Sequence, residues 1–241
     1  EGDRAGSQNG WYVLHAGRVP AGAFGSWKTG QTCTWRAETD TPLTRAERAA
    51  LRRQHEDAQR RRAAEQKRVH QETAARATGL WLRARPATDS HPYLRAKRVR
   101  AVGLRQLRDA LLVPLRDERG KLWSLQFIQP DGGKRFLSGG RTRGCYFAIG
   151  RPQDCLIIAE GYATAATVFE ATGAAPAVAF NAGNLLPVAR LLRRKFPRLR
   201  IIIAADDDHA TPGNPGMAAA RAAADAVGGE VVAPRFVEAA P

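Results

Sequence analysis

The sequence is short of cysteine, of long apolar runs and of aromatic side chains, which make up 7% of its 241 residues. Its three cysteines, Cys33, Cys145 and Cys155, form no C-x-x-C pair, which excludes a zinc ribbon and a disulfide framework. We therefore expect reduced thiols and a cytoplasmic location. No apolar run approaches the ~20 residues that cross a bilayer, and no signal peptide is visible, so we expect no membrane partner. The single methionine is Met217, and we therefore expect the sequence to be a piece of a larger chain.

Acidic residues are also scarce beside basic ones. The chain has 38 Lys and Arg against 23 Asp and Glu, which gives a formal net charge of +15. A basic excess of this size favours polyanions, because neutralising phosphates releases their condensed counterions. We therefore expect a nucleic-acid partner.

Four of the acidic residues directly follow short apolar runs. The run C-L-I-I-A ends on Glu160, and the run L-R-I-I-I-A-A ends on Asp206, Asp207 and Asp208. Runs of this length, rich in β-branched residues, are typical of strands buried on both faces of a parallel sheet. Ligands of open α/β sheets bind at the carboxyl ends of the strands, so these four acids are predicted to share one edge.

Carboxyl groups packed this closely repel one another unless a cation neutralises them. Hard oxygen ligands suit Mg²⁺ or Mn²⁺, so we predict a divalent metal site at Glu160, Asp206, Asp207 and Asp208. Alternate residues of an extended segment face the same way, so Asp206 and Asp208 should share one ion, with Asp207 secondary. A receiver-type phosphoacceptor pocket or a phosphatase site is the alternative, but it usually places a key aspartate on the first strand.

The segment 151–236 alternates between strand-like and helix-like text, which predicts a parallel sheet with right-handed crossovers. Strands are expected at 156–159, 177–180, 201–205 and 230–234, and helices at 162–171, 185–196 and 217–227. Gly173 should end the first helix. Glu160, the loop Asn181-Ala182-Gly183-Asn184 and the aspartates should then line one edge of the sheet.

The motifs E-G-Y-A-T-A from Glu160, D-D-D from Asp206 and F-N-A-G-N-L from Phe180 resemble the Toprim domain of bacterial DnaG-type primases, topoisomerases and some nucleases. The wording is most similar to the Toprim primases of conjugative plasmids and phages. Upstream, L-L-V-P-L-R-D-E-R-G-K-L-W-S-L-Q-F from Leu111 and G-K-R-F-L-S-G-G from Gly133 resemble the subdomain that precedes Toprim in primases. The resemblance covers roughly residues 92–236.

The resemblance implies roles for particular residues. Glu160 matches the family's glutamate, a general acid/base or metal ligand in nucleotidyl transfer, and Asp206 and Asp208 match the metal-holding pair, so these three are the candidate catalytic residues. Gly216 matches the glycine that opens the next helix. The sequence departs from the family at Thr164, where many DnaG-type primases have an acid, in the longer loop 209–215, and in lacking a further acidic motif beyond the last strand.

Basic and loop residues near the acids are candidates for holding substrates. A developing charge on a phosphoryl group is stabilised by positive side chains and loop donors. We predict nucleotide or phosphate contacts from Lys134, Arg135, Arg141, Arg143, Asn181, Gly183 and Asn184. Arg95, Lys97, Arg98 and Arg100 form a basic patch just ahead of the predicted catalytic sheet, and we therefore predict that they contact the phosphates of template DNA. Such contacts position a strand without reading its sequence.

The first part of the chain has a different composition. Residues 1–40 carry aromatics between Gly-rich turns and predict a small β-meander, whose tryptophans could either fill a small core or stack on bases. Residues 41–86 predict a long charged helix that begins with a capping box at Thr44 and Glu47 and buries a thin stripe at Leu51, Val69, Leu80 and Trp81. The expected domains are thus 1–40, 41–86, a primase-type α+β subdomain at 87–150, a Toprim-type α/β domain at 151–236, and a tail at 237–241.

These observations favour a DNA primase core that uses NTPs and a single-stranded DNA template, in plasmid or phage replication or transfer. Its expected partners include other domains of a larger chain, such as a helicase or a relaxase. Two alternatives stay open: a Toprim nuclease or other DNA-cleaving enzyme, and a non-catalytic DNA-binding module of a relaxase or helicase fusion. A nuclease would not need the segment from Leu111 to Gly140.

Overall fold

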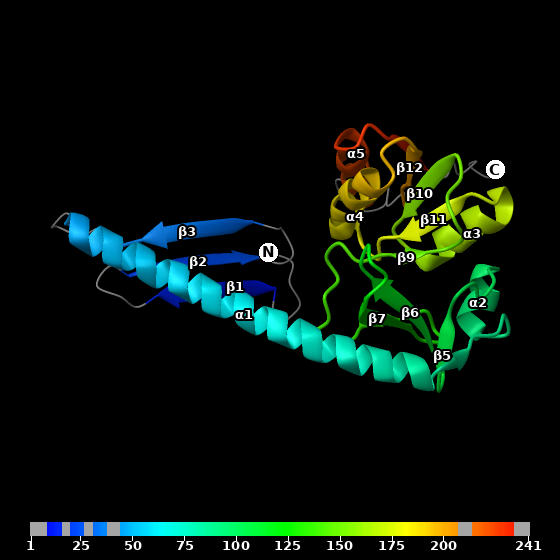
Figure 1. The fold of residues 1–241 in the computed structure, drawn as a ribbon, viewed down its shortest axis with the longest axis horizontal. Coiled ribbons are helices and arrows are strands. Elements are labelled where there is room, and N and C mark those ends of the chain that lie inside the picture. The colour runs from blue at the N-terminus through cyan, green and yellow to red at the C-terminus, as the bar shows by residue number, and fades with distance from the viewer. Residues whose placement is uncertain (1–8, 16–19, 27–30, 38–43, 207–213, 234–241) are drawn as a thin grey trace, which may run out of the picture. The chain divides into compact units, whose positions relative to one another are not determined.

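The computed structural model describes residues 9–15, 20–26, 31–37, 44–206 and 214–233. The chain divides into two compact units, Glu1–Arg61 and Arg62–Pro241. The first contains a three-stranded sheet and the start of helix α1 (Arg45–Arg83). The second contains the rest of α1, two five-stranded sheets and helices α2 to α5 (Figure 1).

The sheet of the first unit is an antiparallel meander, as the sequence predicts. Strands β1 (Gly10–His15), β2 (Ala21–Ser26) and β3 (Thr32–Arg36) pair in that order. Glycines in β2 let indole rings lie on the strand. A β-carbon on Gly22 would come within 2.7 Å of Trp35 Nε1, and one on Gly25 would come within 2.8 Å of the Trp11 ring. Both tryptophans therefore pack on the backbone of β2, although Trp35 stays 43% exposed.

Helix α1 begins at the predicted capping box. The Thr44 N–H donates to Glu47 Oε2 over 2.9 Å, and the Glu47 N–H donates to Thr44 Oγ1 over 3.2 Å. The predicted stripe is confirmed in part, because Val69, Leu80 and Trp81 are half-buried whereas Leu51 is exposed. The helix residues that become fully buried are the small Thr73, Ala74 and Ala77. Small side chains allow close approach to the loop after β8, where a β-carbon on Gly139 would come within 2.9 Å of Thr73 Oγ1.

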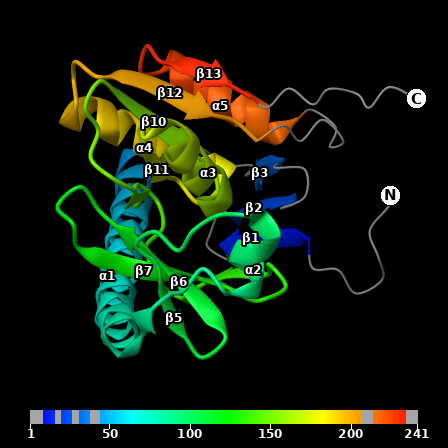
Figure 2. The ribbon, with the colours of Figure 1, turned by 90° about the vertical axis from the view of Figure 1, so that its right-hand side faces the viewer.

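The first five-stranded sheet is antiparallel and its strands follow chain order. It consists of β4 (Arg85–Pro86), β5 (Arg105–Leu107), β6 (Ala110–Arg116), β7 (Leu122–Ile128) and β8 (Lys134–Phe136), with helix α2 (Pro92–Lys97) between β4 and β5. One face lies against α1 (Figure 2), and Leu112 and Leu125 of this face share a core cluster with Ala77 of the helix. The other face, with Leu111 and Ile128, shares a core with the second sheet.

The second sheet has the order β13-β12-β10-β11-β9 and confirms the predicted α/β fold. Strands β10 (Cys155–Ala159), β11 (Ala175–Val178), β12 (Arg200–Ala204) and β13 (Glu230–Val232) are parallel, and β9 (Phe147–Ala148) is antiparallel to β11. Helix α3 (Tyr162–Thr172) packs into one core cluster, whereas α4 (Ala182–Lys195) and α5 (Pro215–Asp225) pack into another. The sheet is therefore covered on both faces.

Several element boundaries differ from the sequence prediction. Helix α4 begins at Ala182, so most of the expected loop 181–184 is the first turn of that helix. The strand expected at 177–180 ends at Val178, because Phe180 adopts a left-handed conformation with φ of 75°. The helix expected at 217–227 begins earlier, at Pro215, because Asn214 caps it and accepts the Met217 N–H through Oδ1 at 3.2 Å. Gly173 ends α3 as predicted, with φ of 69°.

Candidate active site at the edge of the parallel sheet

Strand β10 lies at the centre of the parallel sheet and fixes where the candidate site falls. Ala159, its last residue, is paired with Val178 of β11 on one side and Ala204 of β12 on the other. Glu160 follows β10 directly and Asp206 follows β12 by two residues, so both acids leave neighbouring strands at the same edge. The chain moves from β10 to β11 in one direction and returns to β12 on the other side of β10. Ligands of doubly wound sheets bind at such a switch point.

The motif E-G-Y-A-T joins this edge to the antiparallel sheet's subdomain. Gly161 is the N-cap of α3, and the next residue, Tyr162, is fully buried. The Tyr162 hydroxyl donates to Arg100 O over 2.6 Å and accepts the Val102 N–H over 2.8 Å. Burial raises the pKa of this hydroxyl, which stays protonated. The tyrosine therefore anchors the start of α3, and with it Glu160, to the segment before β5.

Thr164 takes part in the site although it is no acid. Its Oγ1 donates to Asp206 Oδ1 over 3.2 Å, across the gap between α3 and the end of β12. The hydroxyl occupies one lone pair of Oδ1 and leaves Oδ2 for another partner. At the position where many DnaG-type primases carry a carboxylate, this chain therefore has a neutral group that orients the neighbouring aspartate.

Lys134 brings a positive charge to the acidic edge. Its Nζ lies 3.9 Å from the point where a β-carbon would sit on Gly161, the residue after Glu160. Phe136, two residues along β8, packs edge-on against Phe180 with ring centroids 6.1 Å apart. Alternate residues of a strand share a face, so Lys134 and Phe136 both point from β8 toward the parallel sheet.

Arg135 points the other way. Its guanidinium lies 5.4 Å from the centroid of the Phe127 ring, on the face of the antiparallel sheet that packs against α1. The sequence analysis predicts that Lys134 and Arg135 both contact phosphate. In the structure only Lys134 of these two lies near the acidic edge. The period of two along a strand separates them.

Asn184 has a different role from the one predicted. Its side chain is buried, and Nδ2 donates to Cys145 O at 2.9 Å and to Ala179 O at 2.8 Å, while Oδ1 accepts the Gly144 N–H at 2.8 Å. Both amide protons are used, so none is left for a phosphate oxygen. We therefore assign Asn184 to positioning the loop before β9 beside the end of β11.

The other predicted phosphate contacts are placed near this loop. Asn181 is the N-cap of α4 and Gly183 lies exposed in its first turn, at the end of β11 that adjoins Glu160. The Arg141 Nε donates to Arg143 O at 3.1 Å, and its guanidinium lies 5.2 Å from the Trp123 ring centroid. Arg143 is exposed. Their contacts with nucleotides stay predictions.

The predicted DNA contacts Arg95, Lys97, Arg98 and Arg100 are all exposed. Arg98 ends α2 in a left-handed conformation with φ of 55°, and its N–H donates to Arg95 O. The Arg100 N–H is held by Glu170 Oε1 at 2.8 Å, which ties this basic segment to α3. The patch is therefore accessible and attached to the same helix that carries Thr164.

Asp207 and Asp208 lie outside the described residues. In the part of the chain that the structure describes, no three His, Cys, Asp or Glu side chains gather as a complete metal site. Two carboxylates on adjacent strand ends, with a hydroxyl that orients one of them, nevertheless fit the oxygen preference of Mg²⁺ or Mn²⁺. The one clue to the Thr164 contact in the sequence is the departure from the family at that position.

Among the described residues, no helix is both long and apolar enough to span a bilayer.

Comparisons with known proteins identify a matching family and similar chains. Residues 155–239 match the family model described as Toprim domain. Two proteins of Escherichia coli, both named DNA primase TraC, are 40% and 39% identical to the chain over 98% and 99% of its length. The chain spans 23% and 17% of the length of those two relatives. The primase fragment of the bacteriophage T7 primase-helicase protein is 15% identical, with a TM-score of 0.46 over 64% of this chain and 66% of that chain.

The matched family model begins at Cys155, the first residue of β10, and takes in β10 to β13 with the two acids at their edge. The similarity to the two relatives also extends through the meander and α1, beyond the segment 92–236 in which the sequence resembles Toprim primases. Residues 155–239 of this chain are therefore a Toprim domain.

Proposed function

We propose that this chain is the catalytic core of a DNA primase, which joins ribonucleotides into short primers on a single-stranded DNA template in plasmid or phage replication or transfer. The observation that carries the proposal is the meeting of Lys134 from β8 with the acidic edge of the Toprim domain. The names of the two relatives support the choice of reaction. Because the chain spans less than a quarter of either relative, we also propose that it works beside further domains, such as a helicase or relaxase, in the cytoplasm.

Each residue has a defined task in this proposal. Glu160 and Asp206 would hold Mg²⁺ or Mn²⁺ together with Asp208, with Asp207 secondary, and the metal would stabilise the attacking and leaving oxygens of the phosphoryl transfer. Thr164 fixes the orientation of Asp206. Lys134 neutralises charge on the triphosphate from the side of the antiparallel sheet, where a point charge needs no particular bond direction.

The basic patch at Arg95, Lys97, Arg98 and Arg100 would hold the template by its phosphates. The patch is linked to α3 through the Glu170 contact, so a strand bound there lies against the element that begins at the acidic edge. Such contacts carry little sequence preference.

The primase proposal differs from a nuclease in its need for the antiparallel sheet. A cleaving enzyme needs the acids and the metal, whereas polymerisation also needs an incoming triphosphate held opposite them. Lys134, placed by β8, is the group that meets this need.

One assay tests the proposal. The chain is incubated with labelled NTPs, single-stranded DNA and Mg²⁺ or Mn²⁺, and scored for both primer formation and template cleavage. We expect metal-dependent primers that Glu160→Gln abolishes. Cleavage without synthesis would instead indicate a nuclease, and neither product with intact DNA binding would indicate a binding module.

A further inference from the structure

The face of the antiparallel sheet away from the Toprim domain holds an open pocket. Its volume is about 550 Å³, in the range of small-ligand sites. It lies between the last turn of α1 and strands β5 to β8, where the helix covers Leu112 and Leu125 and leaves the rest of the face open. The lining residues that matter to the argument are Leu80, Arg83, Leu107, Arg108, Phe127 and Arg135.

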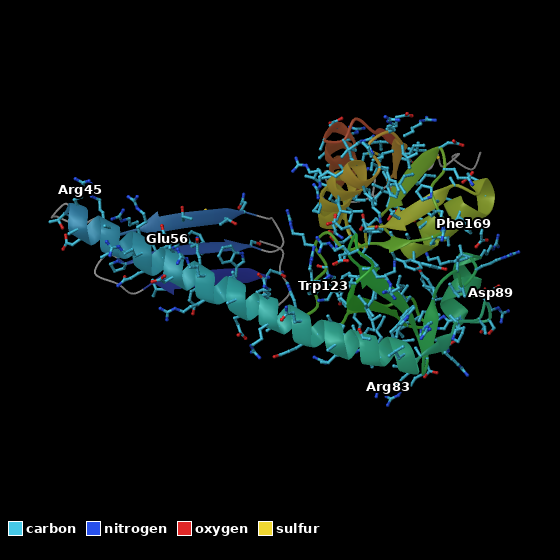
Figure 3. The ribbon with its side chains drawn as sticks, in the orientation of Figure 1. Arg45, Glu56, Arg83, Asp89, Trp123 and Phe169 are labelled. Carbon is cyan, nitrogen blue, oxygen red and sulfur yellow. The ribbon has the colours of Figure 1, made fainter. Side chains whose placement is uncertain are left out.

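Three arginines line this pocket, and none of them forms an ion pair with another residue that the structure describes. Arg83 comes from the end of α1, where Figure 3 labels it, Arg108 from the β5–β6 turn, and Arg135 from β8. All three are exposed. The ion pairs that link described residues involve Arg68 and Arg200 and none of these three. Asp109 also lines the pocket, so three positive charges there face one negative charge.

The floor between the arginines is apolar and partly aromatic. Phe127 pairs with Arg135 across β7 and β8, and the Arg135 guanidinium lies 5.4 Å from the ring centroid. Leu80 and Leu107, both half-buried, continue this surface on either side. A planar cation beside an exposed ring edge is a surface on which a flat aromatic ligand can stack.

We propose that this pocket, which we call the arginine pocket, binds single-stranded nucleic acid as a second site behind the catalytic sheet, with a base on the Phe127–Arg135 surface and phosphates between the arginines. This inference rests on the proposed primase function, which supplies two single strands, the DNA template and the RNA product. Guanidinium groups both pair with phosphate oxygens and stack on bases, and all of the pocket's cations are arginines. The same phosphodiester and base chemistry occurs in either strand, so the experiment compares them.

An acidic protein segment is the competing occupant. Its carboxylates would pair with the arginines, but they have no aromatic ring that could stack on Phe127. The pocket combines charge with a ring, which is the pattern of single-strand sites.

The test measures binding of labelled oligothymidylate and oligouridylate to the 241-residue chain by fluorescence anisotropy across a salt series. The triple variant carries Arg83→Gln, Arg108→Asn and Arg135→Gln. Asparagine is used at 108 because that residue has a φ of 54°, which asparagine tolerates better than alanine or glutamine. With each phosphate contact adding about 0.7 to the salt slope, we expect the slope to fall by roughly 2 and affinity at low salt to fall by about ten-fold or more.

The matched control removes the same charge elsewhere. Arg190→Gln, Arg194→Gln and Arg221→Gln change exposed arginines of α4 and α5, so they lower the net charge equally without touching the pocket. We expect less than half the slope change of the pocket variant. Thermal unfolding verifies that both variants are folded.

A second variant separates stacking from charge. Phe127→Leu keeps the floor apolar and the charge intact, and we expect it to weaken oligonucleotide binding by roughly five-fold with an unchanged salt slope. It should not alter binding of an oligoglutamate peptide.

Equal binding by the pocket and control triple variants would overturn the proposal, and so would an oligoglutamate affinity that falls as much as the oligonucleotide affinity in the pocket variant. A larger loss with one oligonucleotide identifies its strand as the ligand. These outcomes do not depend on synthesis: Glu160→Gln should abolish primers and keep the pocket's contribution to binding. A chain that makes no primers but loses binding in the pocket variant would therefore refute the proposed function alone.

Discussion

The parallel and antiparallel sheets of the second unit share one core but place their charged side chains differently. The parallel sheet gathers acids at one edge, because parallel strands all end in the same direction and Glu160 and Asp206 follow neighbouring strands. The antiparallel sheet spreads its cations over two faces, because Lys134 and Arg135 are adjacent on one strand. A parallel sheet concentrates chemistry at an edge, whereas an antiparallel sheet can serve two surfaces with one short strand.

The largest effect is expected from removing the acid that follows the central strand of the parallel sheet. We expect Glu160→Gln to lower primer synthesis by about a thousand-fold, because the loss of a charge at the reacting phosphate removes several kcal/mol of stabilisation. Anisotropy with single-stranded DNA and thermal unfolding should change little. Normal primer yield from a folded Glu160→Gln protein would remove this residue from the mechanism.

A second prediction contrasts two asparagines of the same F-N-A-G-N motif. Asn184→Leu leaves a buried N–H and two carbonyl groups without partners, so we expect unfolding free energy in urea to fall by about 3 kcal/mol. Asn181→Ala should cost less than about 1 kcal/mol, because the Asn181 side chain makes no capping hydrogen bond. Equal losses would show that Asn184 is not the residue that ties the loop before β9 to β11.

The contribution of the antiparallel sheet to the acidic edge is tested at Lys134. We expect Lys134→Gln to raise the KM for NTPs and lower kcat/KM by about ten- to thirty-fold, because a positive charge opposite the acids is lost. Lys67→Gln, an exposed change of the same kind on α1, serves as the control and should have no effect. If the two variants behave alike, Lys134 does not contact the substrate.

The smallest effect is expected from the hydroxyl that orients Asp206. Thr164→Val preserves size and removes the 3.2 Å hydrogen bond, so we expect calorimetry to show Mg²⁺ or Mn²⁺ binding weakened by about five-fold. Thr164→Ser should restore the affinity, since it keeps the donor. Identical metal affinities for the valine and serine variants would show that the hydroxyl does not position the aspartate.

Much of the fold follows from local sequence. Short β-branched runs between helix-forming stretches determine parallel strands with crossover helices, and Thr44 with Glu47 determines where α1 starts. The acids were found for the same reason, since a carboxylate directly after a buried strand must emerge at the sheet edge. These features depend on neighbours within a few residues, which the sequence displays.

Other features depend on which segments meet, and only the tertiary structure decided them. On α1 the small Thr73, Ala74 and Ala77 are fully buried, because the Gly139 loop and the antiparallel sheet approach there, whereas the larger Leu80 and Trp81 are only half-buried. The Asn184 side chain forms hydrogen bonds with backbone groups of a loop about 40 residues earlier, and the Thr164 hydroxyl donates to Asp206, 42 positions later. Such contacts follow from sheet order and packing. The sequence by itself therefore determined the parallel strands and the acids that follow them, and the tertiary structure decided which side chains lie around those acids.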